Sequence, residues 1–180
     1  MPKSDHFFPI LGELYLCSPT VFINQNWFDL LPDWSNPPQT LIILCLQANC
    51  NLELTEKAIA DEKDRLFDAF QEVAKVMENL AQQNQILIES ICPKSGFSNH
   101  AQAGNLLFDL VSILHECLGF NFKRTDQGCK ILSHPQWQQA IYPGLLISDV
   151  KRDRVAPLVY NVLSNPRIEQ WSKLTIITSN

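Results

Sequence analysis

The chain has 180 residues, of which 46% are hydrophobic and 18% are charged, and its formal net charge is −5 at pH 7. This length suits one domain with a core of ordinary size, and the apolar share excludes a wholly disordered chain. The acidic balance argues against a general nucleic-acid binder, which needs a basic face for phosphates. No apolar run reaches the roughly 18 residues of a membrane span, and the first residues lack the apolar stretch of a signal peptide. We therefore expect a cytoplasmic protein that binds neither membranes nor nucleic acid.

Six cysteines are spread along the chain, at positions Cys17, Cys45, Cys50, Cys92, Cys117 and Cys129. No two of them form a CxxC pair, which argues against a thioredoxin-like motif or a zinc ribbon. A chain of this size has enough core residues to fold without disulfides. We expect reduced thiols, and we interpret the closest pair, Cys45 and Cys50, as a strand residue and a turn residue, since a buried free cysteine acts as a small hydrophobic side chain.

The N-terminal half predicts strands at residues 13–17 and 40–46, with a short helix at 24–31 between them that Asn24 would cap. The strand at 40–46 is apolar throughout, which is typical of a central strand covered on both faces. A long helix is predicted from about residue 56 to 83. Its apolar side chains recur at alternating spacings of four and three residues, at Leu66, Phe70, Val73, Met77 and Leu80.

The C-terminal half predicts strands at 85–91, 120–122, 129–133, 144–148 and 174–177, with helices at about 104–118 and 155–163. Gly119 stands in the usual position for ending a helix. A loop rich in turn-forming residues occupies 92–99. Because strand pairs are mixed with long helices, we predict an α+β fold around one sheet.

General catalytic and metal-binding motifs are not found: the six glycines form no G-x-G-x-x-G and the four histidines are far apart in sequence. Cys129 is the most distinctive candidate, because Lys123, Arg124 and Lys130 lie near it in the chain. Cationic neighbours favour the thiolate of an accessible cysteine, and a thiolate suits a soft metal centre. A cysteine protease pair of Cys129 with His134 or His100 is conceivable, but nothing indicates a third partner. An inert cysteine at a strand edge is the simpler alternative.

Residues 119–137 carry a Gly-Phe pair, the run Asp126-Gln127-Gly128-Cys129-Lys130, and then His134 and Trp137. The earlier loop Cys92–Phe97 and the run from Glu13 to Pro32 complete a pattern of order and spacing. This pattern, over roughly residues 12–150, resembles the CblD cobalamin-trafficking family, the family of the methylmalonic aciduria and homocystinuria type D protein.

The resemblance implies a nitroreductase-like mixed sheet with flanking helices that has lost its flavin site. Residues 1–150 would form a single CblD-like domain, and residues 151–180 a C-terminal extension packed on the same domain, with a homodimer left open. The family is not known for turnover, so we expect no enzyme but an adaptor or chaperone in cobalamin metabolism. Its partner would be a CblC-like cobalamin-processing protein or a cobalamin-dependent enzyme.

The site residues follow from the same resemblance. Cys129 would offer its thiolate to the cobalt of transiently bound cobalamin. Gly128 would allow the backbone to approach the corrin or the partner closely, and Lys130 would favour the thiolate. His134 and Trp137 would support the strand.

Two alternatives from other classes stay open. One is a flavin- or thiol-dependent reductase of nitroreductase-like fold, which a yellow colour on purification would favour. The other is a plain protein-interaction domain with an inert Cys129, which would show no affinity for a corrin.

Overall fold

The most apolar segment of the chain lies at the centre of its sheet. The computed structural model describes residues 9–53, 57–170 and 172–177. In it, β2 (Thr40–Gln47) pairs antiparallel with β1 (Ile10–Cys17) and with β6 (Ile141–Ser148). The edge strands are β3 (Ile88–Ile91) and β7 (Ser172–Ile177), which gives the order β3-β6-β2-β1-β7. Only the β1–β7 pair in this sheet is parallel. The predicted α+β class and the central place of residues 40–46 are confirmed.

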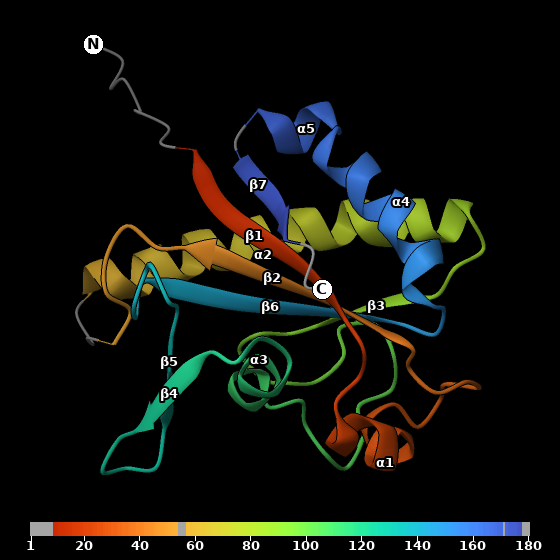
Figure 1. Ribbon diagram of the computed structural model, residues 1–180, viewed down its shortest axis with the longest axis horizontal. Helices are drawn as coiled ribbons and strands as arrows, with labels where there is room; N and C mark the ends of the chain where they lie inside the picture. Colours follow the sequence, from red (N-terminus) through yellow and green to blue (C-terminus); the bar gives the residue numbers. More distant parts are fainter. Residues whose placement is uncertain (1–8, 54–56, 171, 178–180) are drawn as a thin grey trace.

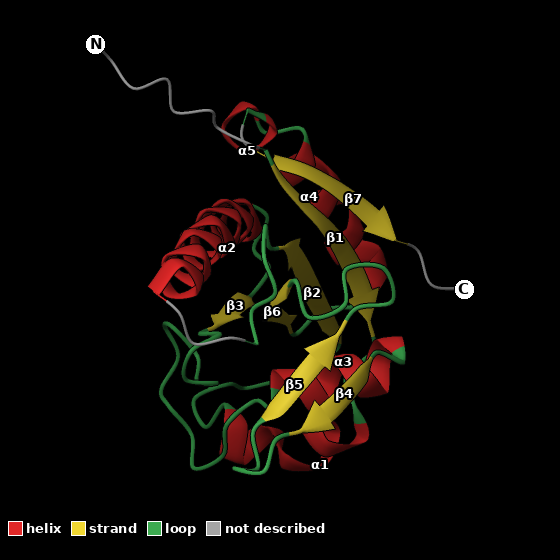
Figure 2. Ribbon diagram, turned by 90° about the vertical axis from the view of Figure 1, so that its left-hand side faces the viewer, coloured by secondary structure: helices red, strands yellow, loops and turns green. Residues whose placement is uncertain are grey.

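Alternate side chains of β2 enter two separate cores, one on each face of the sheet. Ile42 and Leu44 join the core under α2 (Lys57–Gln83) and α4 (Arg152–Leu163). Leu41 and Ile43 join the core under α1 (Val21–Leu30) and α3 (Leu110–Leu118). Figures 1 and 2 show α1 and α3 together on the lower side of the sheet. Both faces of the sheet are thus covered by helices, as its two-sided apolar pattern requires.

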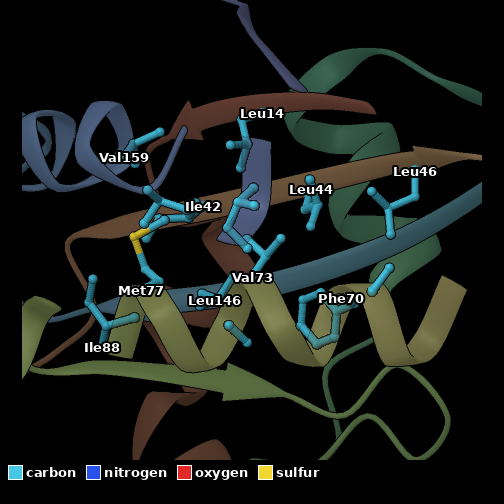
Figure 3. Packing of buried hydrophobic residues seen from close by; sticks show 14 of the residues in the cluster. Leu14, Ile42, Leu44, Leu46, Phe70, Val73, Met77, Ile88, Leu146 and Val159 are labelled. Carbon is cyan, nitrogen blue, oxygen red and sulfur yellow. The ribbon is translucent and has the colours of Figure 1, made fainter. Parts of the chain in front are cut away.

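The long helix α2 packs on the sheet through the predicted stripe. Leu66, Phe70, Val73 and Met77 are fully buried, and Figure 3 shows the last three directed toward β2 and β6. The predicted helix is confirmed from Lys57 to Gln83, while its expected beginning at residue 56 lies outside the described residues.

The predicted beginning of α1 was wrong. The helix begins at Val21, and Thr20 caps it by accepting a hydrogen bond from the Ile23 backbone N–H at 3.2 Å. Asn24 lies within the helix, where its side chain donates to the Pro19 carbonyl oxygen at 3.3 Å. A threonine four residues upstream of Asn24 is the cap instead, since threonine is also among the residues preferred at this position.

The predicted beginning of α3 was also wrong. Residues 104–109 form a loop, and Asp109 caps the helix through the Ser112 backbone N–H at 3.1 Å. Leu107, which falls within the predicted helix, lies in this loop and is 49% exposed. At the other end the prediction is confirmed, because Gly119 ends the helix with a φ of 70°.

A separate two-stranded hairpin follows α3 and lies on the same side of the sheet (Figure 2). It consists of β4 (Asn121–Arg124) and β5 (Lys130–Ser133), close to the predicted strands. The remaining boundaries differ by a few residues: β3, β6 and α4 begin at Ile88, Ile141 and Arg152. A short helix, α5 (Pro166–Glu169), precedes β7. Within the described residues, no helix combines the length and hydropathy that crossing a bilayer would need.

Candidate functional site

Cys129 is an exposed thiol at the border of a cavity of about 690 Å³. The hairpin, the beginning of β6 and the loop after β2 line this cavity. Its charged lining comes from Glu53, Lys63, Asp126 and Lys130, and its apolar lining includes Leu52, Val111, Ile131, Ile141 and Tyr142. An open, mixed apolar and polar concavity of this size falls in the range of small-molecule sites.

The turn before β5 holds the backbone of Cys129 in place. The carbonyl oxygen of Cys129 accepts from the Thr125 N–H at 2.9 Å, and its own N–H donates to Thr125 Oγ1 at 3.1 Å. The Gly128 N–H closes the turn by donating to the Thr125 carbonyl oxygen at 2.9 Å. Three hydrogen bonds to one residue therefore fix the position from which the thiol projects.

Gly128 has a φ of 82°, in the left-handed region that favours glycine. A Cβ at this position would meet no atom within 4 Å. The turn itself thus requires glycine here, and the open space beside it leaves the backbone accessible to a ligand or partner.

Lys130 is joined to α3. Its ammonium forms an ion pair with Asp109 and donates to Ser112 Oγ at 2.5 Å. Burial alone would raise the pKa of the Asp109 carboxyl, but the hydrogen bonds from Lys130 and Ser112 lower it overall. The charge that was expected to favour a thiolate at Cys129 is therefore shared with a carboxylate, and Lys130 fastens the hairpin to the helix.

His134 is buried and lies at the end of β5 between two aromatic rings. It stacks on Trp137 with ring centroids 3.9 Å apart and meets the edge of Phe120 at 5.0 Å. Its Nδ1 accepts from the backbone N–H groups of Gln136 and Trp137, at 3.1 and 3.2 Å. These contacts suit the supporting role that was expected for His134 and Trp137.

The hydrogen bonds also define the tautomer of His134. Because Nδ1 is an acceptor, the proton lies on Nε2, which donates to Glu13 Oε2 at 3.0 Å. The same oxygen of Glu13 accepts a hydrogen bond from the Tyr15 hydroxyl. Burial is the main cause that raises the pKa of Tyr15, and this hydrogen bond is the second. This network connects the hairpin to β1 of the main sheet, well inside the protein.

The two segments that carry most of the family resemblance meet at the cavity. Pro93, from the loop Cys92–Phe97, lines it together with the hairpin. A second cavity of about 280 Å³ continues from there and shares Pro93, Val111 and Tyr142 with the first. Burial would raise the pKa of the Cys92 thiol, but hydrogen bonds with Ser95 and the Lys94 backbone lower it overall.

Sequence reasoning missed two residues that build the site. Asp109 was placed inside a helix, although it caps α3 and binds Lys130. Thr125 was left between two predicted strands without a role, although a threonine four residues before Cys129 could have suggested a side-chain hydrogen bond that closes a turn. The neighbouring Lys123 pairs with Glu53 at 2.7 Å and holds the far edge of the hairpin. Together these residues position the hairpin over the cavity.

No protein-family model matches this chain, and no curated protein matches it significantly. The resemblance to the CblD family therefore stays a prediction, and so do the roles that it implies for Gly128, Cys129 and Lys130. The accessible thiol beside the cavity is a feature of the structure that does not depend on this resemblance.

Proposed function

We propose that this protein is a non-enzymatic, cytoplasmic cobalamin-handling adaptor that offers the thiolate of Cys129 to cobalt. The cofactor would be cargo, bound transiently and shared with a CblC-like processing protein or a cobalamin-dependent enzyme. The single observation that carries the proposal is the exposed Cys129 thiol on a well-defined turn beside the 690 Å³ cavity.

The site fits one axial ligand to a metal that already sits in a macrocycle. A thiolate is a soft donor that binds such a centre well. The adjoining cavity has both apolar walls and charged groups, which suits a corrin edge with amide side chains. A corrin with its nucleotide is larger than a drug-sized ligand, so part of it would remain outside the cavity for a partner to hold.

The chemistry is ligand exchange without a change of oxidation state. The sulfur lone pair forms the bond to cobalt(III), a coordinated water leaves, and the thiol proton passes to solvent. Because a metal centre displaces the proton of the thiol that it binds, the exchange does not depend on Lys130 as a cationic neighbour.

The proposal extends to the finer fold assignment. We infer a nitroreductase-like sheet whose flavin site is lost, on the basis of the family resemblance and of a mixed five-stranded sheet with helices on both faces. Residues 151–180 would belong to the same domain, since α4 packs on the main core and β7 pairs with β1.

The experiment is a spectral titration of cob(III)alamin with the purified protein, in the presence of a CblC-like protein. We expect the visible spectrum of the corrin to change as sulfur replaces water, and we expect Cys129→Ser to abolish the change. Cys50→Ser is the matched control, because it also removes a thiol but not one that lines the cavity; it should behave as the original protein does.

If Cys129→Ser caused the same spectral change as the original protein, the proposal would be wrong. A protein that purifies yellow, with the absorbance of a flavin, would favour the reductase instead. A protein that binds no corrin, with or without the CblC-like partner, would favour the plain protein-interaction domain with an inert Cys129.

A further inference from the structure

Two cysteines far apart in sequence come close together on the side of the sheet that carries α1 and α3. Cys17 ends β1, and Cys117 lies in the last turn of α3. Both side chains pack against the core on this face, and Cys117 Sγ lies 3.9 Å from the carbonyl oxygen of Ser18, the residue that follows Cys17. The neighbouring Glu116 accepts a hydrogen bond from the Val21 N–H at 3.1 Å. Consecutive residues of α3 thus hold this helix end against the turn between β1 and α1.

The two thiols differ in a way that suits sequential chemistry. The neighbouring Cys117 thiol, assisted by the charge of Arg152, lowers the pKa of Cys17 although burial opposes it. The nearness of Cys17, together with burial, raises the pKa of Cys117. Both side chains are half-buried, so a small reagent can reach them. A thiolate beside a protonated thiol is the arrangement of an attacking and a resolving cysteine.

We propose that Cys17 and Cys117 are a redox modification site, which forms an intramolecular disulfide when the protein meets a small-molecule disulfide such as oxidised glutathione. The Cys17 thiolate attacks one sulfur of the reagent, forms a mixed disulfide and releases one thiolate. Cys117 gives its proton to that thiolate and attacks the Cys17 sulfur, which releases a second thiolate; this thiolate takes up from solvent the proton that Cys17 lost when it ionised. The protein loses two electrons and two protons, and the reagent becomes two thiols.

The bond would join the first strand of the sheet to the helix that carries the hairpin. Two thiols that pack against the same core face, at a point where α3 meets the residue after Cys17, need little backbone movement to pair. The other cysteines differ in setting: Cys45 is fully buried in β2, where burial raises the pKa of its thiol, and Cys129 is exposed on the hairpin. An exposed thiol such as Cys129 is therefore expected to carry a mixed disulfide, whereas Cys17 and Cys117 should be found joined to each other.

The test treats the purified full chain with oxidised glutathione, alkylates the remaining thiols and maps the peptides by mass spectrometry. We expect a linked Cys17–Cys117 peptide and a melting temperature higher by roughly 5–15 °C, since the bond closes a long loop. Dithiothreitol should reverse both effects. Cys117→Ser should instead leave glutathione on Cys17, and Cys50→Ser should keep the linked peptide.

Free or separately glutathionylated Cys17 and Cys117 in the oxidised original protein would overturn the proposal. So would a Cys117→Ser variant whose melting temperature rises as much as that of the original protein. The peptide map of the unaltered chain decides the question even if a variant fails to fold, and none of these outcomes depends on cobalamin.

Discussion

At Gly144 the sheet and α2 approach each other closely. A Cβ there would lie 2.3 Å from Phe70 Cδ2 and 2.4 Å from Phe70 Cε2, and the Phe70 ring is fully buried. The ring has no free space into which it can move, because packing in a protein core is dense. Gly144 therefore lets the longest helix rest directly on β6.

We predict that Gly144→Ala lowers the free energy of unfolding by about 1–3 kcal/mol, since an added methyl group overpacks the core. Urea denaturation measures the change. Gly119→Ala is the control: its Cβ would meet no atom within 4 Å, so only the positive φ costs energy, on the order of 1 kcal/mol. The double variant Gly144→Ala with Phe70→Leu should lose less free energy of unfolding than the two single variants lose together. Strictly additive losses would show that the new methyl group does not clash with the Phe70 ring.

At the scale of elements, the β4–β5 hairpin stands outside the main sheet and depends on side chains to stay in place. The ion pair of Lys130 with Asp109 ties it to the beginning of α3, and the ammonium also lies 5.6 Å from the centre of the Phe122 ring. Lys130 is 19% exposed and Asp109 is 41% exposed, so solvent weakens this pair only in part.

We predict that Lys130→Met, which keeps the apolar stem and removes the charge, loosens the hairpin locally. A loss of about 1 kcal/mol would speed amide exchange in β4 and β5 roughly fivefold, as hydrogen–deuterium exchange can measure. Lys94→Met is the matched control, because it removes an ammonium paired with Asp64 on the surface. Unchanged exchange in the hairpin of Lys130→Met would show that the pair does not hold it.

The sequence predicts those elements best whose form depends on their own residues. Periodicity located α2 and the uniformly apolar β2, because burial of a continuous stripe or of both faces leaves a direct pattern. The beginning of α3 could not be found in this way, because tertiary contacts determine it. Gly104 lies so close to the backbone of Asp29 that no side chain would fit, and the Leu106 N–H donates to the Asp29 carbonyl oxygen at 3.2 Å.

In the candidate site, too, features that are local in the sequence could be predicted, and features that the fold brings together could not. The turn at Gly128 and Cys129 was visible in the sequence, because glycine and polar residues mark turns locally. The cavity beside it was not, since Pro93, Tyr142 and the hairpin meet only through the fold. The partner of Lys130 was missed for the same reason: Asp109 is close in space but 21 positions away.

At the scale of the whole molecule, one buried carboxylate connects stability to pH. Glu62 of α2 is only 9% exposed, and it accepts hydrogen bonds from the Asn49 N–H at 2.8 Å and from two nitrogens of Arg65 at 2.7 Å. Burial raises the pKa of Glu62, but the bonds from Arg65 and Asn49 outweigh it and lower the pKa below its ordinary value of 4.5. Glu62 thereby ties the long helix to the end of β2.

The folded protein consequently binds fewer protons at Glu62 than the unfolded chain does. The stability that this group adds is fully present above pH 4.5, and it is lost as the pH falls through the lower pKa of the folded state.

We predict that Glu62→Gln lowers the free energy of unfolding by roughly 1.5–3 kcal/mol at pH 7. The gap between variant and original protein should narrow in urea titrations below pH 4.5. Glu72→Gln, on the same helix in a surface pair with Arg167, should change little at either pH. A gap for Glu62→Gln that stays constant down to pH 3 would show that the ionised carboxylate is not what stabilises this junction.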